Sequence, residues 1–396
     1  MINKILIGLG CVITPFICMS GYDTRVPKMA SALVFSLALS LWVFFNGEIK
    51  PFKNKWILIF IGYLMVNIYF SPKINIMIFD NNVGNIWVWH SISHILIFAM
   101  ALISISSIDF DAKTIKLIFN IMTWCGLVMA VYCILQALCI EQFFALMGTG
   151  IHQLAYDRQI CGTLGHQTIV SPFMAMIIPI AIYSRKYWQA IVIAIAVIIT
   201  MSQVAIGAMV ISLMFYFGVK GKRNLIAMIT LGLIIISGYA FYKPLISTID
   251  DHGRFIAWKI LVKDMTAPSE QLKYPITGVG IGSFAYTFHI RHPHDKGYQA
   301  HNEYLEVFWN TGLVGLFIFI SGIFYIWKQN FSLKDILNKK INKYRMTLLA
   351  SFLCISLCAL GTFVWHLGAH IFYTLVIIGL LMNKSELNQE EICTGK

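Results

Sequence analysis

Charged residues are scarce in this sequence: they make up 12% of its 396 residues. A soluble domain carries about 25% charged and about 45–50% apolar residues, whereas 58% of this chain is apolar. The scarcity of charge therefore excludes an ordinary soluble domain. The short alternating segments typical of a transmembrane β-barrel are also missing, because the apolar residues run continuously.

Paired cysteines are missing as well. The chain has nine cysteines but no CxxC pair, and most of them fall inside apolar runs, where a free cysteine behaves as a small hydrophobic side chain. This excludes a disulfide framework and a cysteine-based metal site. The histidines of HIRHPHDKGYQAH have no cysteine or carboxylate set beside them, so we expect no metal and no cofactor. No basic stripe with interleaved aromatic residues occurs in a soluble segment, which excludes nucleic acid as a partner.

Long apolar stretches are what the sequence does contain. Many reach about 18 residues, the length that crosses the hydrocarbon layer as a helix, and a helix satisfies its own backbone hydrogen bonds in lipid. The sequence predicts an all-α polytopic membrane protein with about twelve transmembrane helices. The expected spans are Ile5–Ser20, Met29–Phe45, Trp56–Phe70, Trp87–Ser104, Thr114–Ile140, Thr168–Ser184, Trp188–Met201, Gln203–Val219, Leu225–Tyr242, Glu303–Trp327, Met346–Trp365 and Leu367–Met382.

The distribution of basic residues predicts the orientation. With a cytoplasmic N-terminus and twelve spans, roughly 19 of the lysines and arginines face the cytoplasm and roughly 11 face outward. The densest cluster, residues 328–345, then lies inside. We therefore expect both termini in the cytoplasm of a bacterial inner membrane. The net charge of +12 follows from this asymmetry and from contact with anionic membrane lipids.

Two segments outside the expected spans are long, residues 141–167 and residues 243–302, and loops of such length are usually functional or disordered. The second contains HGRFIAWKILVKDM, whose apolar residues Phe255, Trp258, Ile260, Leu261 and Val262 predict an amphipathic helix at the membrane surface, with its lysines in solvent. We expect residues 1–396 to form a single integral membrane domain, in which residues 243–302 form a periplasmic cap with short helices between spans nine and ten.

The order GRFIAW, PITGVGIGSF and AHNEYLEVFWNTGLVGL resembles the O-antigen ligase and polymerase superfamily. The stretch RQICGTLGHQTIVSPFMAMIIPIAI is similar to the loop and helix that enter the middle of the bundle in that family. The resemblance runs from about Arg158 to Gly315. One position departs from it: many relatives carry Ser-Arg after the seventh span, whereas this chain has Ser202-Gln203, so one phosphate-binding arginine is absent.

This resemblance implies a membrane glycosyltransferase that moves a glycan from undecaprenyl diphosphate to a periplasmic hydroxyl, without a metal. Such a site needs cations for the diphosphate, and arginine pairs with phosphate oxygens bidentately. It also needs a proton acceptor, and histidine titrates near neutral pH. Arg254 and His301 are the expected catalytic residues. Arg291, Arg158, His166 and Gln167 are the expected residues of the diphosphate site.

Several alternatives remain open on the sequence alone. O-antigen ligation to lipid A-core is the preferred reaction, and O-antigen polymerisation and protein O-oligosaccharide transfer use the same type of donor. A polysaccharide or lipid transporter is the non-enzyme alternative, but transporters place ionisable groups within their spans, which are almost free of charge here. His366 and His370 lie one turn apart near an external helix end; both could line the same cavity, but buried capping is the preferred interpretation.

Overall fold

The computed structural model describes residues 2–17, 25–70, 84–138, 160–218, 254–266, 273–284, 300–332 and 342–383. In these ranges every regular element is a helix, which confirms the all-α prediction. The longer helices are α1 (Ile2–Phe16), α2 (Arg25–Phe45), α3 (Lys55–Phe70), α5 (Gly84–Ser107), α6 (Ala112–Ala137), α9 (Gln167–Tyr183), α10 (Tyr187–Ile199), α11 (Gln203–Gly218), α17 (Glu303–Asn330), α19 (Lys343–Cys358) and α20 (Gly368–Met382). The shorter helices are α14 (Arg254–Thr266), α15 (Lys273–Thr277) and a 3₁₀ turn, η1 (Val364–His366).

Three of the described helices are long and apolar enough to cross a membrane, over Val26–Phe45, Ala112–Ala137 and Glu303–Asn330. Seven shorter apolar helices accompany them. The protein is therefore a helical membrane protein. The expected pair of short helices at 188–201 and 203–219 is confirmed, since α10 and α11 are separate helices joined by three residues. The expected span Leu225–Tyr242 lies outside the described residues.

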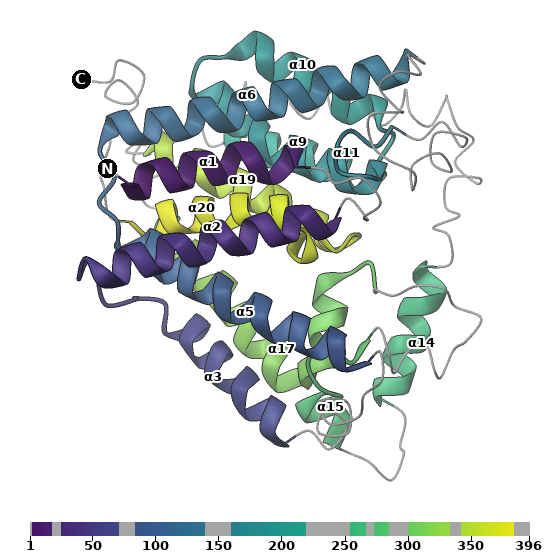
Figure 1. Cartoon of the computed structure of the whole chain (residues 1–396). Coiled ribbons are helices and arrows are strands. Elements are labelled where there is room, and N and C mark those ends of the chain that lie inside the picture. The colour runs from purple at the N-terminus through teal and green to yellow at the C-terminus, as the bar shows by residue number, and fades with distance from the viewer. Residues whose placement is uncertain are drawn as a thin grey trace.

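Helix α9 lies at the centre of the bundle. It packs against α6, α10, α11 and α19, and nearly all of its side chains are buried. A helix that is apolar on every side belongs in such a surrounded position. Figure 1 shows α6, α10, α1 and α2 around this centre, with α3, α5 and α17 forming the adjoining part of the bundle.

Short connections bring one set of helix ends together. Lys4 pairs with Asp111, the N-cap of α6, at 3.0 Å, and Lys50 pairs with Asp109 at 2.5 Å. The Tyr183 ring at the end of α9 contacts the Tyr344 ring at the start of α19. We call this the basic end of the bundle because it carries a group of basic residues. They are Lys4, Lys50, Lys53, Lys55, Lys113, Arg185, Lys186, Lys328 and Lys343.

The opposite end, which we call the cap end, carries α14 and α15 beside the start of α17 (Figure 1). Leu261 and Met265 of α14 pack with Phe308 and Trp309 of α17 in a small separate core. The expected helix in HGRFIAWKILVKDM is confirmed. The prediction of its apolar face was wrong at Val262, which is exposed. The face that packs on α17 is formed by Leu261 and Met265, while Val262 points away from this core.

One helix ends well short of its expected boundary, and another is interrupted within its expected span. The helix expected over Met346–Trp365 ends at Cys358, because the carbonyl of Ala359 accepts the backbone N–H of Glu303 at 2.9 Å instead of continuing the helical ladder. The helix expected over Glu303–Trp327 extends to Asn330 and is interrupted at Gly312, where φ is 67° and ψ is −169°. The early end of α19 and the interruption at Gly312 both lie at the cap end, where the chain bonds to other segments rather than to its own helix.

Candidate functional site

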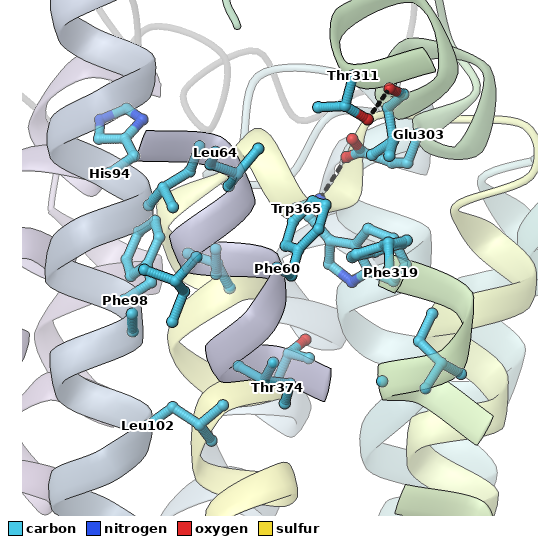
Figure 2. Close-up of a pocket in the computed structure, with 18 of the residues that line it drawn as sticks. Phe60, Leu64, His94, Phe98, Leu102, Glu303, Thr311, Phe319, Trp365 and Thr374 are labelled. Carbon is cyan, nitrogen blue, oxygen red and sulfur yellow. Dashed lines mark hydrogen bonds between the residues drawn. The ribbon is translucent and has the colours of Figure 1, made fainter. Parts of the chain in front are cut away.

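A largely apolar cavity of about 300 Å³ lies between α3, α5, α17 and α20. Figure 2 shows Phe60 and Leu64 of α3 facing Phe98 and Leu102 of α5 across it. Glu303 lies toward one end, and Leu102 and Thr374 lie toward the other (Figure 2). The cavity is therefore lined by apolar side chains over most of its length. Ionisable side chains line it at the end where α17 begins.

Three ionisable side chains line that end. The Nδ1 atom of His366 lies 2.9 Å from a carboxylate oxygen of Glu303, and its Nε2 atom lies 3.5 Å from Glu306. Both carboxylates are nearly inaccessible to solvent, whereas the imidazole is about one-third exposed. All three residues line the cavity. We call Glu303, Glu306 and His366 the carboxylate–imidazole cluster.

The two carboxylates set the protonation state of the imidazole. Burial alone lowers the pKa of His366, because an imidazolium is poorly solvated there. The charges of Glu303 and Glu306 act in the opposite direction and prevail, raising this pKa to about 10. His366 is consequently a cation at neutral pH, and it lies between the carboxyl groups of Glu303 and Glu306 at the cavity wall.

The connection between α19 and α20, residues 359–367, is where the remaining polar contacts meet. The Nη1 atom of Arg254 donates to the carbonyl of Gly361 at 3.1 Å. The ring of His301 packs edge-on against Phe363 with centroids 4.9 Å apart. Residues from α14 and from the start of α17 thus contact the same short connection, although they are far apart in the sequence.

His301 has an unusual backbone conformation. Its φ is 50°, in the left-handed region that non-glycine residues seldom adopt. The next residue, Asn302, caps α17 by accepting the N–H groups of Tyr304 and Leu305 at 3.1 Å each, which is the usual role of asparagine at this position. The indole of Trp258 donates to the carbonyl of Ala300 at 2.7 Å. The turn that carries His301 is therefore held on both sides.

The glycine-rich segment ITGVGIGSF packs its backbone against the interruption in α17. Val279 N–H donates to the Trp309 carbonyl at 2.8 Å, and Gly280 N–H donates to the Asn310 carbonyl at 3.0 Å. A Cβ atom at Gly278 would lie 2.4 Å from the backbone of Asn310, so only glycine allows this approach. This contact opens α17 at Gly312 and brings Ile281 and Gly282 to the cavity.

The structure brings together only part of the site expected from the sequence. Arg254 and His301 both contact the 359–367 connection. His166 caps α9 through its Nδ1 atom, which accepts the N–H of Thr168, and the carbonyl of Thr168 accepts the Thr362 hydroxyl at 3.5 Å. His166 and Gln167 thus lie beside a residue that reaches the same connection.

Two expected diphosphate ligands, Arg158 and Arg291, lie outside the described residues. Lys259 and Lys263 on α14 are exposed, as the sequence analysis expected for solvated charges.

The carboxylate–imidazole cluster is not among the features expected from the sequence. Neither Glu303 nor Glu306 is among the site residues expected from the sequence, and capping was preferred for His366. Packing and capping account for His370, whose Nε2–H donates to the Ile169 carbonyl at 2.8 Å, but His366 faces the cavity. A signal was available: Glu303 and Glu306 are spaced i, i+3 on one helix face, and ionisable residues in a membrane span are functional candidates by default.

Residues 188–320 match the protein family described as O-Antigen ligase. The match covers about a third of the chain and contains Gln203, Arg254, Arg291 and His301, while Arg158, His166 and Gln167 precede it. No curated protein matches the chain. The matched residues include α14, α15, the glycine-rich segment and the start of α17, which are the elements that build the cap end. Over this segment the chain is similar to the O-antigen ligase family, in agreement with the resemblance found in the sequence.

Proposed function

We propose that this protein is an inner-membrane glycosyltransferase that moves a glycan from undecaprenyl diphosphate to a hydroxyl acceptor, by ligation of O-antigen to lipid A-core. The observation that carries the proposal is the apolar cavity, whose ionisable end lies beside the connection contacted by Arg254 and His301. A lipid-linked donor has the matching chemistry, because it joins a long hydrocarbon tail to a doubly charged diphosphate.

In this reaction the polyprenyl tail lies in the cavity between α3, α5, α17 and α20, where it contacts aromatic and aliphatic side chains. Arg254 binds the diphosphate at the cap end, since its guanidinium presents N–H groups in a planar fork that matches phosphate oxygens. Arg291 and Arg158 are the further diphosphate ligands, and His166 and Gln167 border the site. The absence of an arginine at Gln203 leaves more of the charge neutralisation to Arg254.

Proton transfer is assigned to His301. The acceptor hydroxyl attacks the anomeric carbon, the bond from that carbon to the phosphate oxygen breaks, and undecaprenyl diphosphate leaves with the electron pair. His301 accepts or directs the hydroxyl proton, as a general base near neutral pH does. A single displacement of this kind inverts the anomeric carbon. Neither a metal nor a cofactor takes part in these steps.

The orientation follows from the positions of the charges. The basic end collects lysines and arginines from several connections, and such residues are enriched on the cytoplasmic side. We therefore place both termini in the cytoplasm and the cap end, with residues 243–302, in the periplasm. Twelve spans in a single domain of residues 1–396 agree with this arrangement. The cap end is then on the side where the glycan donor and lipid A-core meet.

The test is a transfer assay with purified protein, undecaprenyl-diphosphate-linked glycan and lipid A-core in the presence of EDTA, with products analysed by gel electrophoresis and mass spectrometry. Glycan on lipid A-core is the expected product. Longer carrier-linked chains with unmodified core would show a polymerase instead. If neither product forms, a protein acceptor becomes the next substrate to test, and translocation without transfer would show a transporter.

Replacing Arg254 with lysine is expected to reduce transfer about 10- to 100-fold, mainly through weaker binding of the donor. Lysine keeps the positive charge but loses the planar fork that pairs with two phosphate oxygens. The measurement is kcat and KM for the donor in the transfer assay. Lys259→Gln is the matched control, because Lys259 lies on the same helix and is exposed. Equal losses in the two variants would assign the effect to the general charge of α14 rather than to Arg254.

A further inference from the structure

The carboxylate–imidazole cluster is not explained by binding of the donor or by proton transfer at His301. Its two carboxylates are buried in the wall of an apolar cavity, where an ion is expensive to desolvate unless it is paired. Apolar side chains of similar volume would pack there at a lower free energy. The presence of three ionisable groups at one place in this wall therefore indicates a role in the site.

Each carboxylate binds a backbone group beside a residue of the proposed site. One oxygen of Glu306 accepts the N–H of Ala300, the residue before His301, at 3.3 Å. One oxygen of Glu303 accepts the N–H of Trp365 at 2.6 Å. The remaining carboxylate oxygens face the two nitrogens of His366. Glu306 thus holds the turn that carries His301, and Glu303 holds the 359–367 connection. His366 links these two segments because it contacts both carboxylates.

The 359–367 connection also determines where the two proposed catalytic side chains lie. It provides the Gly361 carbonyl for Arg254 and the Phe363 ring for His301. Glu303 binds this connection a second time, because its own N–H donates to the Ala359 carbonyl at 2.9 Å. A displacement of the connection would therefore move Arg254 and His301 together.

We propose that Glu303 and Glu306 are positioning residues for the transfer reaction, which hold His301 and the 359–367 connection in register through His366. The proposal rests on the function proposed above. It assigns no contact with substrate to either carboxylate. Both residues act on the geometry of His301 and Arg254, for which small displacements have large kinetic effects.

The protonation of His366 should make transfer depend on pH. The groups that face His366 directly are Glu303 and Glu306 of α17. Among the described residues, the other titratable groups around the same connection and cavity are Arg254 of α14, His301, Tyr304 of α17, His370 of α20 and His94 of α5. With both carboxylates present the imidazolium persists through neutral pH. With one carboxylate removed, the pKa of His366 falls, so the remaining ion pair is lost at a lower pH than in the wild type.

The experiment compares Glu303→Gln and Glu306→Gln with the wild-type protein in the transfer assay across pH. Glutamine keeps the size of the side chain and its backbone hydrogen bond but removes the charge. We expect kcat to fall roughly 10- to 100-fold, with little change in the KM for the donor. Transfer by Glu306→Gln should decline at a lower pH than transfer by the wild type, because the imidazolium loses its proton earlier. Glu48→Gln is the matched control, because Glu48 is exposed and lies at the basic end, after α2.

Wild-type kcat and an unchanged pH profile in both glutamine variants would overturn the proposal. So would a lower yield of folded protein whose remaining molecules transfer at the wild-type rate, because the carboxylates would then serve stability alone. Amide hydrogen exchange over residues 359–367 provides a readout that does not depend on transfer. Faster exchange in Glu303→Ala than in the wild type supports the proposed restraint, and unchanged exchange overturns it. Absence of transfer by the wild type with every acceptor would instead refute the proposed function.

Discussion

Replacing His301 with asparagine is expected to reduce transfer about 10²- to 10⁴-fold, the range typical for loss of a general base. Asparagine tolerates the left-handed backbone conformation observed at this position. The variant should therefore keep the turn before α17 while losing the imidazole. The loss should appear in kcat rather than in the KM for the donor, because His301 is assigned to the acceptor hydroxyl. Steady-state transfer at several donor concentrations measures both quantities.

The control is the neighbouring substitution Asn302→Ala, which removes the helix cap but leaves the imidazole in place. Loss of the two hydrogen bonds to Tyr304 and Leu305 is expected to destabilise the protein by about 1 kcal/mol. Transfer by the folded protein should fall far less than in His301→Asn. A folded His301→Asn variant with wild-type kcat would exclude His301 as the proton acceptor, and attention would move to the residues of the cap that precede it.

The helices of the bundle could be predicted from apolar runs, because positions that face other helices and positions that face lipid both favour apolar side chains. Helix α9 is an example, since its continuous apolar sequence specifies a helix whether its neighbours are lipid tails or other helices. The end of α19 could not be predicted in this way. There the apolar run continues past Cys358, but a backbone hydrogen bond from Glu303 N–H to the Ala359 carbonyl competes with the helical ladder. Such a bond depends on tertiary contacts that no local pattern contains.

Only part of the candidate site could be predicted from the sequence. Arg254 and His301 were identified through the resemblance, and their side chains contact a common connection. The carboxylate–imidazole cluster was not identified, because Glu306 and His366 meet only after two distant segments have packed. When charges are counted along each span, Glu303 and Glu306 look like charged residues at the end of a helix, where charge is common. Only their spacing on one face, i to i+3, distinguished them from solvated charges.

The largest structural effect is expected at Gly312, where α17 is interrupted. The combination of φ 67° with ψ −169° belongs to a region that is essentially restricted to glycine. A Cβ atom would also lie 2.3 Å from the carbonyl oxygen of Ile276 and 2.5 Å from the nitrogen of Gly278. Both neighbours are backbone atoms, so a rotamer change cannot relieve the contact.

Gly312→Ala is therefore expected to destabilise the protein by about 3 kcal/mol or more, from backbone strain and from overpacking together. Thermal unfolding in detergent measures the loss. Transfer should fall as well, because displacement of the glycine-rich segment moves Ile281 and Gly282 at the cavity. Gly207→Ala in α11 is the matched control, since its Cβ would meet no atom within 4 Å, and a helical alanine is favoured over glycine by about 1 kcal/mol. If both alanine variants were equally stable, the interruption of α17 and its contact with the glycine-rich segment would not exist in the folded protein.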